Sequence, residues 1–95
     1  MAADKPPLKI WVMDRGFVLV GRAAVDMDNY LMMRLTDCAV VRVWGTTEGL
    51  GQLASRGPQD KTILDDEPEG TEINQTYVTR SIPCSEGAWK KWLNS

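Results

Sequence analysis

The chain has 95 residues, a formal net charge of −2 and no histidine. This length provides one small domain that buries about two-thirds of the surface of its unfolded state, which excludes two domains. The weak and mixed charge gives no field that would gather DNA or RNA, so we do not expect nucleic acid as a partner. Without histidine, the chain lacks Ser-His-Asp and Cys-His catalysis and every zinc site that uses an imidazole.

The N-terminal segment and the two cysteines indicate where the protein works. Residues 1–7 have no apolar signal-peptide core, and no apolar run approaches the roughly 20 residues needed to cross a bilayer. Cys38 and Cys84 lack C-x-x-C spacing, so we expect reduced, buried thiols and neither a metal nor a cofactor. We therefore expect a soluble cytoplasmic protein without membrane contact.

Residues 8–44, which follow a flexible arm at 1–7, predict an antiparallel meander of four strands. Their links have two or three residues, and parallel crossovers need about a dozen. The expected strands are Leu8–Met13, Phe17–Asp26, Tyr30–Leu35 and Cys38–Trp44, joined by turns at Asp14-Arg15-Gly16, Asp28-Asn29 and Thr36-Asp37.

The meander is apolar on both faces, as the runs 17–20, 30–33 and 39–41 show. An antiparallel sheet in a small domain commonly has one solvated face. We therefore expect the second face to be covered by helices, by a second sheet or by another subunit, and a homo-oligomer is predicted on this ground.

The rest of the chain completes a β-rich α+β fold in a single domain, 1–95. Residues 45–58 form a glycine-rich turn and a short helix, which has Leu50, Leu53 and Ala54 at helical spacing and stops at Gly57-Pro58. Residues 59–84 contain strands at Lys61–Leu64 and Thr71–Ile82 and an acidic loop. Residues 85–95 form a final helical turn that Ser85 caps and that carries Trp89 and Trp92.

The glycine-rich junction is the candidate binding site, because N–H groups at such a turn can bind an anion. Gly49 to Ala54 fits G-x-G-x-x-A, but the strands before it are hairpins and the chain beyond Asp66 is too short for a dinucleotide-binding sheet. A Walker loop is excluded, since no Lys lies between Gly45 and Gln52.

A looser constellation remains around this junction and predicts a nucleotide-like, anionic ligand. Arg offers forked donors to phosphate, Trp offers a stacking face, and hydroxyl and N–H groups fix orientation. The candidate ligand-binding residues are Arg42, Trp44, Thr46, Thr47, Gly49 and Arg56, and no catalytic residue is assigned. Purely structural roles are the alternative: a threonine caps the helix, Trp44 fills the core edge and Arg42 pairs with an acidic neighbour.

The acidic segment is a weaker candidate for carboxylate chemistry. Crowded carboxylates can raise one another's pKa, which would suit an enzyme. The segment lacks the spacing of a calcium loop, and Pro68 with Gly70 is turn chemistry, so a solvated loop is the better interpretation. Its members are Asp65, Asp66, Glu67, Glu69 and Glu72.

The chain resembles a group of short phage, prophage and bacterial proteins of unassigned activity. The resemblance spans about residues 10–84 and is carried by residues 43–54 (V-W-G-T-T-E-G-L-G-Q-L-A), Gly57-Pro58, Thr62, Leu64 and Asp65, with Arg15 to Gly21 upstream. It implies a phage accessory protein: an assembly part, an inhibitor of host defence, or an oligomeric sponge that sequesters nucleotide-derived signals.

These observations predict a small, oligomeric, non-enzymatic binding protein that sequesters an anionic, nucleotide-like ligand in the host cytoplasm. The alternative is a protein-interaction or phage assembly module without a small-molecule ligand, in which the junction is only structural. An enzyme is the third possibility.

Overall fold

The computed structural model describes residues 5–26 and 29–95. They form the predicted β-rich α+β fold, an antiparallel sheet of six strands with two short helices. The elements in chain order are β1 (Leu8–Met13), η1 (Asp14–Gly16), β2 (Val18–Asp26), β3 (Asn29–Val43), α1 (Leu50–Arg56), β4 (Ile63–Asp66), β5 (Thr71–Asn74), η2 (Gln75–Tyr77), β6 (Val78–Pro83) and α2 (Glu86–Leu93). The turn predicted at Asp28-Asn29 lies partly outside the described residues.

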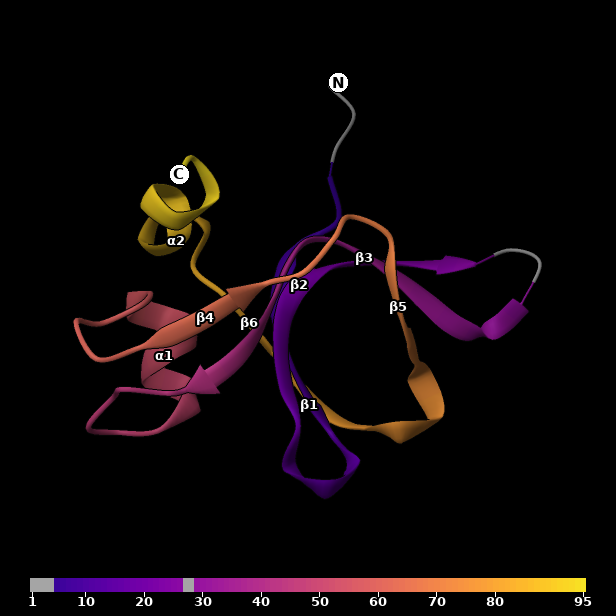
Figure 1. The fold of residues 1–95 in the computed structure, drawn as a ribbon, viewed down its shortest axis with the longest axis horizontal. Helices are drawn as coiled ribbons and strands as arrows, with labels where there is room; N and C mark the ends of the chain where they lie inside the picture. The colour runs from indigo at the N-terminus through magenta and orange to yellow at the C-terminus, as the bar shows by residue number, and fades with distance from the viewer. Residues whose placement is uncertain (1–4, 27–28) are drawn as a thin grey trace.

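The sheet curls until its two ends are joined by a short turn. The strand order is β4-β3-β2-β1-β6, and β5 also pairs with β3. Along β3, the segment 32–35 pairs with β5 and the segment 39–43 pairs with β4. The three-residue turn η2 leads from β5 to β6 on the far side of β1, so the chain closes into a ring (Figure 1).

The turn predicted at Thr36-Asp37 is wrong, because β3 runs through these residues as one strand of 15 residues. Asp37 and Cys38 stand opposite the single residue Gly21 of β2, which is a bulge. Asp37 has a φ of 48°, in the left-handed region that Asp tolerates. The meander therefore has three strands.

The strand predicted over Thr71–Ile82 is instead divided into β5 and β6 by η2. Asn74 starts this turn, since its side-chain oxygen accepts hydrogen bonds from the Thr76 backbone N–H at 2.9 Å and the Thr76 hydroxyl at 2.6 Å. This short bend carries the chain from one end of the sheet to the other.

Both apolar faces of the sheet are covered within one chain. Helices α1 and α2 cover the first face. The buried residues of this layer are Leu8, Ile10, Val18, Val20, Ala39 and Val41 from the sheet and Leu50, Leu53, Ala54 and Trp89 from the helices. The curl of the sheet encloses the second face, whose buried residues are Trp11, Leu19, Met33, Leu35, Cys38 and Ile73. The expectation of an uncovered apolar face, on which the homo-oligomer was predicted, therefore does not hold. The homo-oligomer itself stays a prediction.

Helices α1 and α2 are held together by hydrogen bonds from a tryptophan side chain and by a close backbone approach. Trp89 Nε1 donates to the carbonyl oxygens of Leu53 and Ala54 at 3.1 and 3.2 Å, at the last turn of α1. Gly57 ends α1 with a φ of 82°, and a Cβ there would lie 2.3 Å from the Ala88 carbonyl oxygen. As predicted, Ser85 caps α2; its hydroxyl oxygen accepts from the Ala88 N–H at 3.4 Å.

Arg22 of β2 joins the sheet, the bulge and α2. Its side chain, 8% exposed, donates to Asp37 Oδ2 at 2.9 Å and to both Glu86 carboxylate oxygens at 2.9 and 2.7 Å. It also donates to the Pro6 carbonyl oxygen at 2.8 Å, and Glu86 accepts the Leu8 N–H at 2.9 Å. The hydrogen bonds from Arg22 hold the pKa of Glu86 below its ordinary value of 4.5.

We expect Arg22→Met to lower the free energy of unfolding by about 2–3 kcal/mol, because it leaves two carboxylates without a cation. The half-exposed Glu86 keeps the loss below that of a fully buried pair.

Glu86→Gln tests the charge of Glu86 alone. Since the folded pKa of Glu86 is lowered, the wild type's advantage over Glu86→Gln should be complete above pH 4.5 and decline as pH falls through the folded pKa. Urea denaturation of both proteins from neutral pH to about pH 3 measures the difference in their free energies of unfolding. A difference that does not change with pH would contradict this role of Glu86.

The two C-terminal tryptophans should differ in their contribution to stability. Trp89 is fully buried, whereas Trp92 is half-buried with its ring 5.5 Å from that of Trp89 in an edge-on contact. We expect Trp89→Ala to cost about 3–5 kcal/mol and Trp92→Ala clearly less. Equal losses in thermal or urea unfolding would show that the degree of burial does not determine the cost.

Candidate functional site

The glycine-rich junction between β3 and α1 is shaped by close backbone approach. Gly45 has a φ of 69°, and a Cβ there would lie 2.2 Å from the Thr62 backbone nitrogen. The Thr62 hydroxyl donates to the Trp44 carbonyl oxygen at 2.6 Å, which ties the end of β3 to the segment before β4. Gly49, with a φ of 87°, is the N-cap of α1, and no side chain caps the helix. Neither Thr46 nor Thr47 is therefore the cap.

The polar groups predicted to bind an anion have partners inside the junction. Gln52 Oε1 accepts hydrogen bonds from the Thr47 N–H and hydroxyl at 3.1 Å each and from the Glu48 N–H at 2.6 Å. This amide oxygen thus takes the position that an anion would occupy. The Thr46 hydroxyl donates to the Gly49 carbonyl oxygen at 2.8 Å.

The two arginines of the junction each face a carboxylate. Arg42 makes a two-pronged contact with Asp65, with Nε–Oδ2 and Nη2–Oδ1 distances of 2.9 Å, and these hydrogen bonds lower the pKa of Asp65. Arg56 Nη2 lies 3.8 Å from Glu48 Oε1. Both pairs are exposed and contribute little stability.

The six predicted ligand-binding residues lie in one region of the chain, around the end of β3 and the start of α1. Trp44 is 44% exposed on the surface. None of the six lines either of the two cavities described below. Their role in binding stays a prediction.

The acidic segment borders a small cleft beside α2. It has a volume of about 200 Å³ and is lined by Asp37, Cys38, Asp66, Glu67, Glu69, Trp92, Leu93 and Ser95. Burial raises the pKa of Cys38 to about 12, so its thiol is neutral. No group of His, Cys, Asp and Glu side chains in residues 5–26 and 29–95 has an arrangement that could hold a metal ion.

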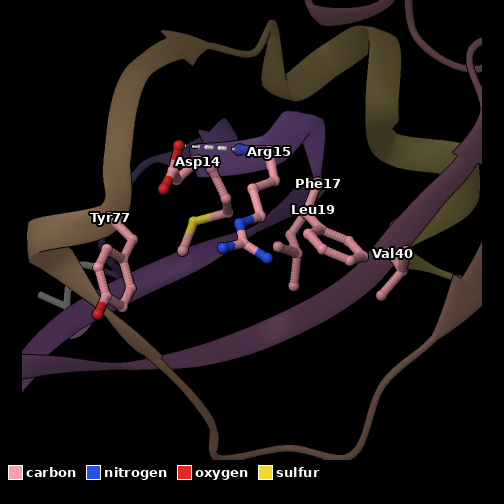
Figure 2. Close-up of a pocket in the computed structure, with 7 residues that line it drawn as sticks. Asp14, Arg15, Phe17, Leu19, Val40 and Tyr77 are labelled. Carbon is pink, nitrogen blue, oxygen red and sulfur yellow. Dashed lines mark hydrogen bonds between the residues drawn. The ribbon is translucent and has the colours of Figure 1, made fainter.

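A larger pocket opens at the end of the ring where η1 and η2 lie, and we call it the mouth pocket. Its volume is about 540 Å³, within the range of small-molecule sites. Five apolar or aromatic residues and two charged ones line it: Met13, Phe17, Leu19, Val40 and Tyr77, with Asp14 and Arg15 (Figure 2). Leu19 and Val40 are register partners on the enclosed face, so they form its floor.

The walls of the mouth pocket are exposed aromatic rings. Phe17 is 65% exposed and Tyr77 is 57% exposed. Phe17 follows η1, and Tyr77 ends η2, so two turns separated by about 60 residues meet across the opening. Sequence reasoning missed this site. The turn at 14–16 was predicted, but nothing in the residues around Tyr77 indicates that η2 returns to it.

Comparison of this chain with protein-family models, with curated proteins and with solved structures found no match. Neither α1 nor α2 in the described part of the chain is long and apolar enough to cross a membrane.

Two alanine substitutions in the glycine-rich segment should have opposite effects. Gly45→Ala should cost more than about 3 kcal/mol, because its Cβ would collide with the backbone of Thr62 at a left-handed φ. Gly51→Ala places its Cβ in open space within α1, so we expect a gain of up to about 1 kcal/mol. Thermal unfolding of both variants measures this. A tolerated Gly45→Ala would contradict the packing described for the junction.

Proposed function

We propose that this protein is a non-enzymatic binding protein that sequesters a small, planar molecule in the mouth pocket. The observation that carries the proposal is an apolar floor between two exposed aromatic rings in a cavity of about 540 Å³. Planar ligands gain both apolar burial and ring contacts from such walls.

Exposed aromatic side chains around a concave surface are more informative than single exposed ones. Phe17 and Tyr77 would each bury a large apolar area if they lay in the core, yet both remain exposed at the rim of one cavity. A ligand between them would remove this area from water, at about 25 cal/mol for each Å². Two strongly exposed aromatic side chains of the described residues therefore lie at the place where a ligand fits.

The residues of this chain suit the binding of a ligand better than the catalysis of a reaction. The chain has no histidine, and the charged groups of the mouth pocket are one carboxylate and one guanidinium. A nucleotide-like ligand, predicted from the sequence for the junction, has a more suitable place here, since the hydrogen-bonding groups of the junction already have partners. A phage-derived sponge in the host cytoplasm remains the setting we propose, with a homo-oligomer as its predicted form.

A protein-interaction module is the second candidate, and a different surface favours it. Val43 and Ile63 are register partners on β3 and β4, and they are 41% and 39% exposed. Trp44, which follows Val43 in the chain, is also exposed, at 44%. Such adjacent apolar residues can form a contact surface for another protein.

The proposal predicts that a planar fluorescent probe binds in the mouth pocket. We expect N-phenyl naphthylamine or anilinonaphthalene sulfonate to bind the folded protein with enhanced emission. Phe17→Ala and Tyr77→Ala should each weaken binding about tenfold, because each removes a ring face worth roughly 0.5–1.5 kcal/mol beyond its area. Both residues are exposed, so these variants should keep the fold.

Trp44→Ala is the matched control, since it removes an exposed aromatic ring outside the pocket. Its probe affinity should equal that of the wild type. If neither probe binds, or if the Phe17 and Tyr77 variants bind as well as the wild type does, the mouth pocket is not the binding site.

A further inference from the structure

We propose that the ligand of the mouth pocket carries an anionic group on its planar, apolar body, and that Arg15 binds this group. This inference rests on the proposed function, because it concerns the chemistry of a ligand in the same pocket. Three observations support it: where the Arg15 guanidinium lies, which partners it lacks, and the backbone conformation that places it there.

Arg15 is one of the residues that line the mouth pocket, and Figure 2 draws its guanidinium among the other lining side chains. In Figure 2 it lies between Tyr77 on one side and Phe17 and Leu19 on the other. A guanidinium presents several N–H donors in one plane, which matches a carboxylate, sulfonate or phosphate group in two-pronged contacts. A flat ligand on the apolar floor would therefore bring its anionic group to these donors.

Within the described part of the chain, this cation has no ion-pair partner. Among residues 5–26 and 29–95, no carboxylate lies within ion-pair distance of the Arg15 guanidinium, unlike Arg22, Arg34, Arg42 and Arg56. The adjacent Asp14 lines the same pocket, but its Oδ1 accepts the Arg15 backbone N–H at 3.0 Å. Arg15 is exposed, so the positive charge of its side chain is available to a ligand in the pocket.

The backbone at Arg15 has a conformation that is rare for a residue with a side chain. Its φ is 66° and its ψ is 16°, and Gly16 follows with a φ of 83°. The Met13 N–H donates to the Phe17 carbonyl oxygen at 2.7 Å and closes this turn. Glycine would adopt the conformation of Arg15 without strain, so the turn itself does not require an arginine. Unfavourable backbone geometry of this kind is concentrated at functional sites.

The experiment compares two probes that share a naphthylamine ring system. Anilinonaphthalene sulfonate carries an anionic group, and N-phenyl naphthylamine is its neutral counterpart. We expect the wild type to bind the sulfonate about tenfold more tightly than the neutral probe, as a charge-assisted hydrogen bond predicts. Arg15→Gln and Arg15→Gly should abolish this preference and leave the affinity for the neutral probe within about twofold.

Two variants guard against a trivial loss of binding. Arg15→Gly suits the left-handed backbone, so it should keep the turn and remove only the side chain. Arg56→Gln removes the same charge from α1, outside the pocket, and should retain the preference. Equal binding of the two probes by the wild type, or a preference that survives in both Arg15 variants, would overturn this inference while leaving the binding pocket intact. If neither probe binds at all, the proposed function itself fails.

Competition assigns the source of the anionic group. Adenosine monophosphate and naphthoate are each added to the complex with anilinonaphthalene sulfonate. Displacement by the nucleotide alone assigns a phosphate ligand, and displacement by naphthoate alone assigns an aromatic carboxylate; displacement by both supports the shared chemistry. If neither compound displaces the probe at millimolar concentration, the assignment of a planar anion is overturned.

Discussion

The ion pair between Arg22 and Asp37 holds the bulge on which the rest of the fold depends. Asp37 adopts the left-handed backbone conformation that the bulge requires. Its Oδ2 also lies 2.9 Å from Arg22 Nε. The bulge changes the direction of β3. The edge of β3 that faces away from β2 therefore pairs with β5 over residues 32–35 and with β4 over residues 39–43. The β5 pairing brings η2 across the open end of the sheet, and so the bulge also creates the mouth pocket. Glu86 completes the network and ties the first residue of α2 to β2.

Much of the fold can be predicted from the sequence, because local patterns determine it. The strand Leu8–Met13, the end of α1 before Gly57 and the cap at Ser85 were all predicted where they occur. The errors arise where one local signal has two meanings. Thr36-Asp37 has turn chemistry, but a left-handed Asp serves a bulge equally well, and only the register against Gly21 decides between them.

The candidate site was harder to predict, since binding groups are defined by what surrounds them. The sequence places two threonines, a tryptophan and two arginines near the glycine-rich turn. It cannot show that Thr47 already donates a hydrogen bond to Gln52, or that Arg42 already donates to Asp65. The opposite holds at the mouth pocket. Arg15 and Tyr77 are separated by 62 residues and line one pocket because the sheet curls. Long-range contacts of this kind have no local signature in a single sequence.

The contact between Leu8 and Glu86 has a consequence for how the chain acquires its structure during synthesis. The Leu8 N–H and the Glu86 carboxylate are 78 residues apart in sequence, and Arg22 is 64 residues from the same carboxylate. Until the ribosome has released the segment around Glu86, Arg22 lacks its strongest partner and the first face of the sheet lacks Trp89. Contacts over such distances must overcome loop-closure entropy before they stabilise the domain, so folding is slow compared with that of helical proteins of equal size. Until that segment has been made, the first face of the sheet stays uncovered, and exposed apolar surfaces of this kind promote aggregation.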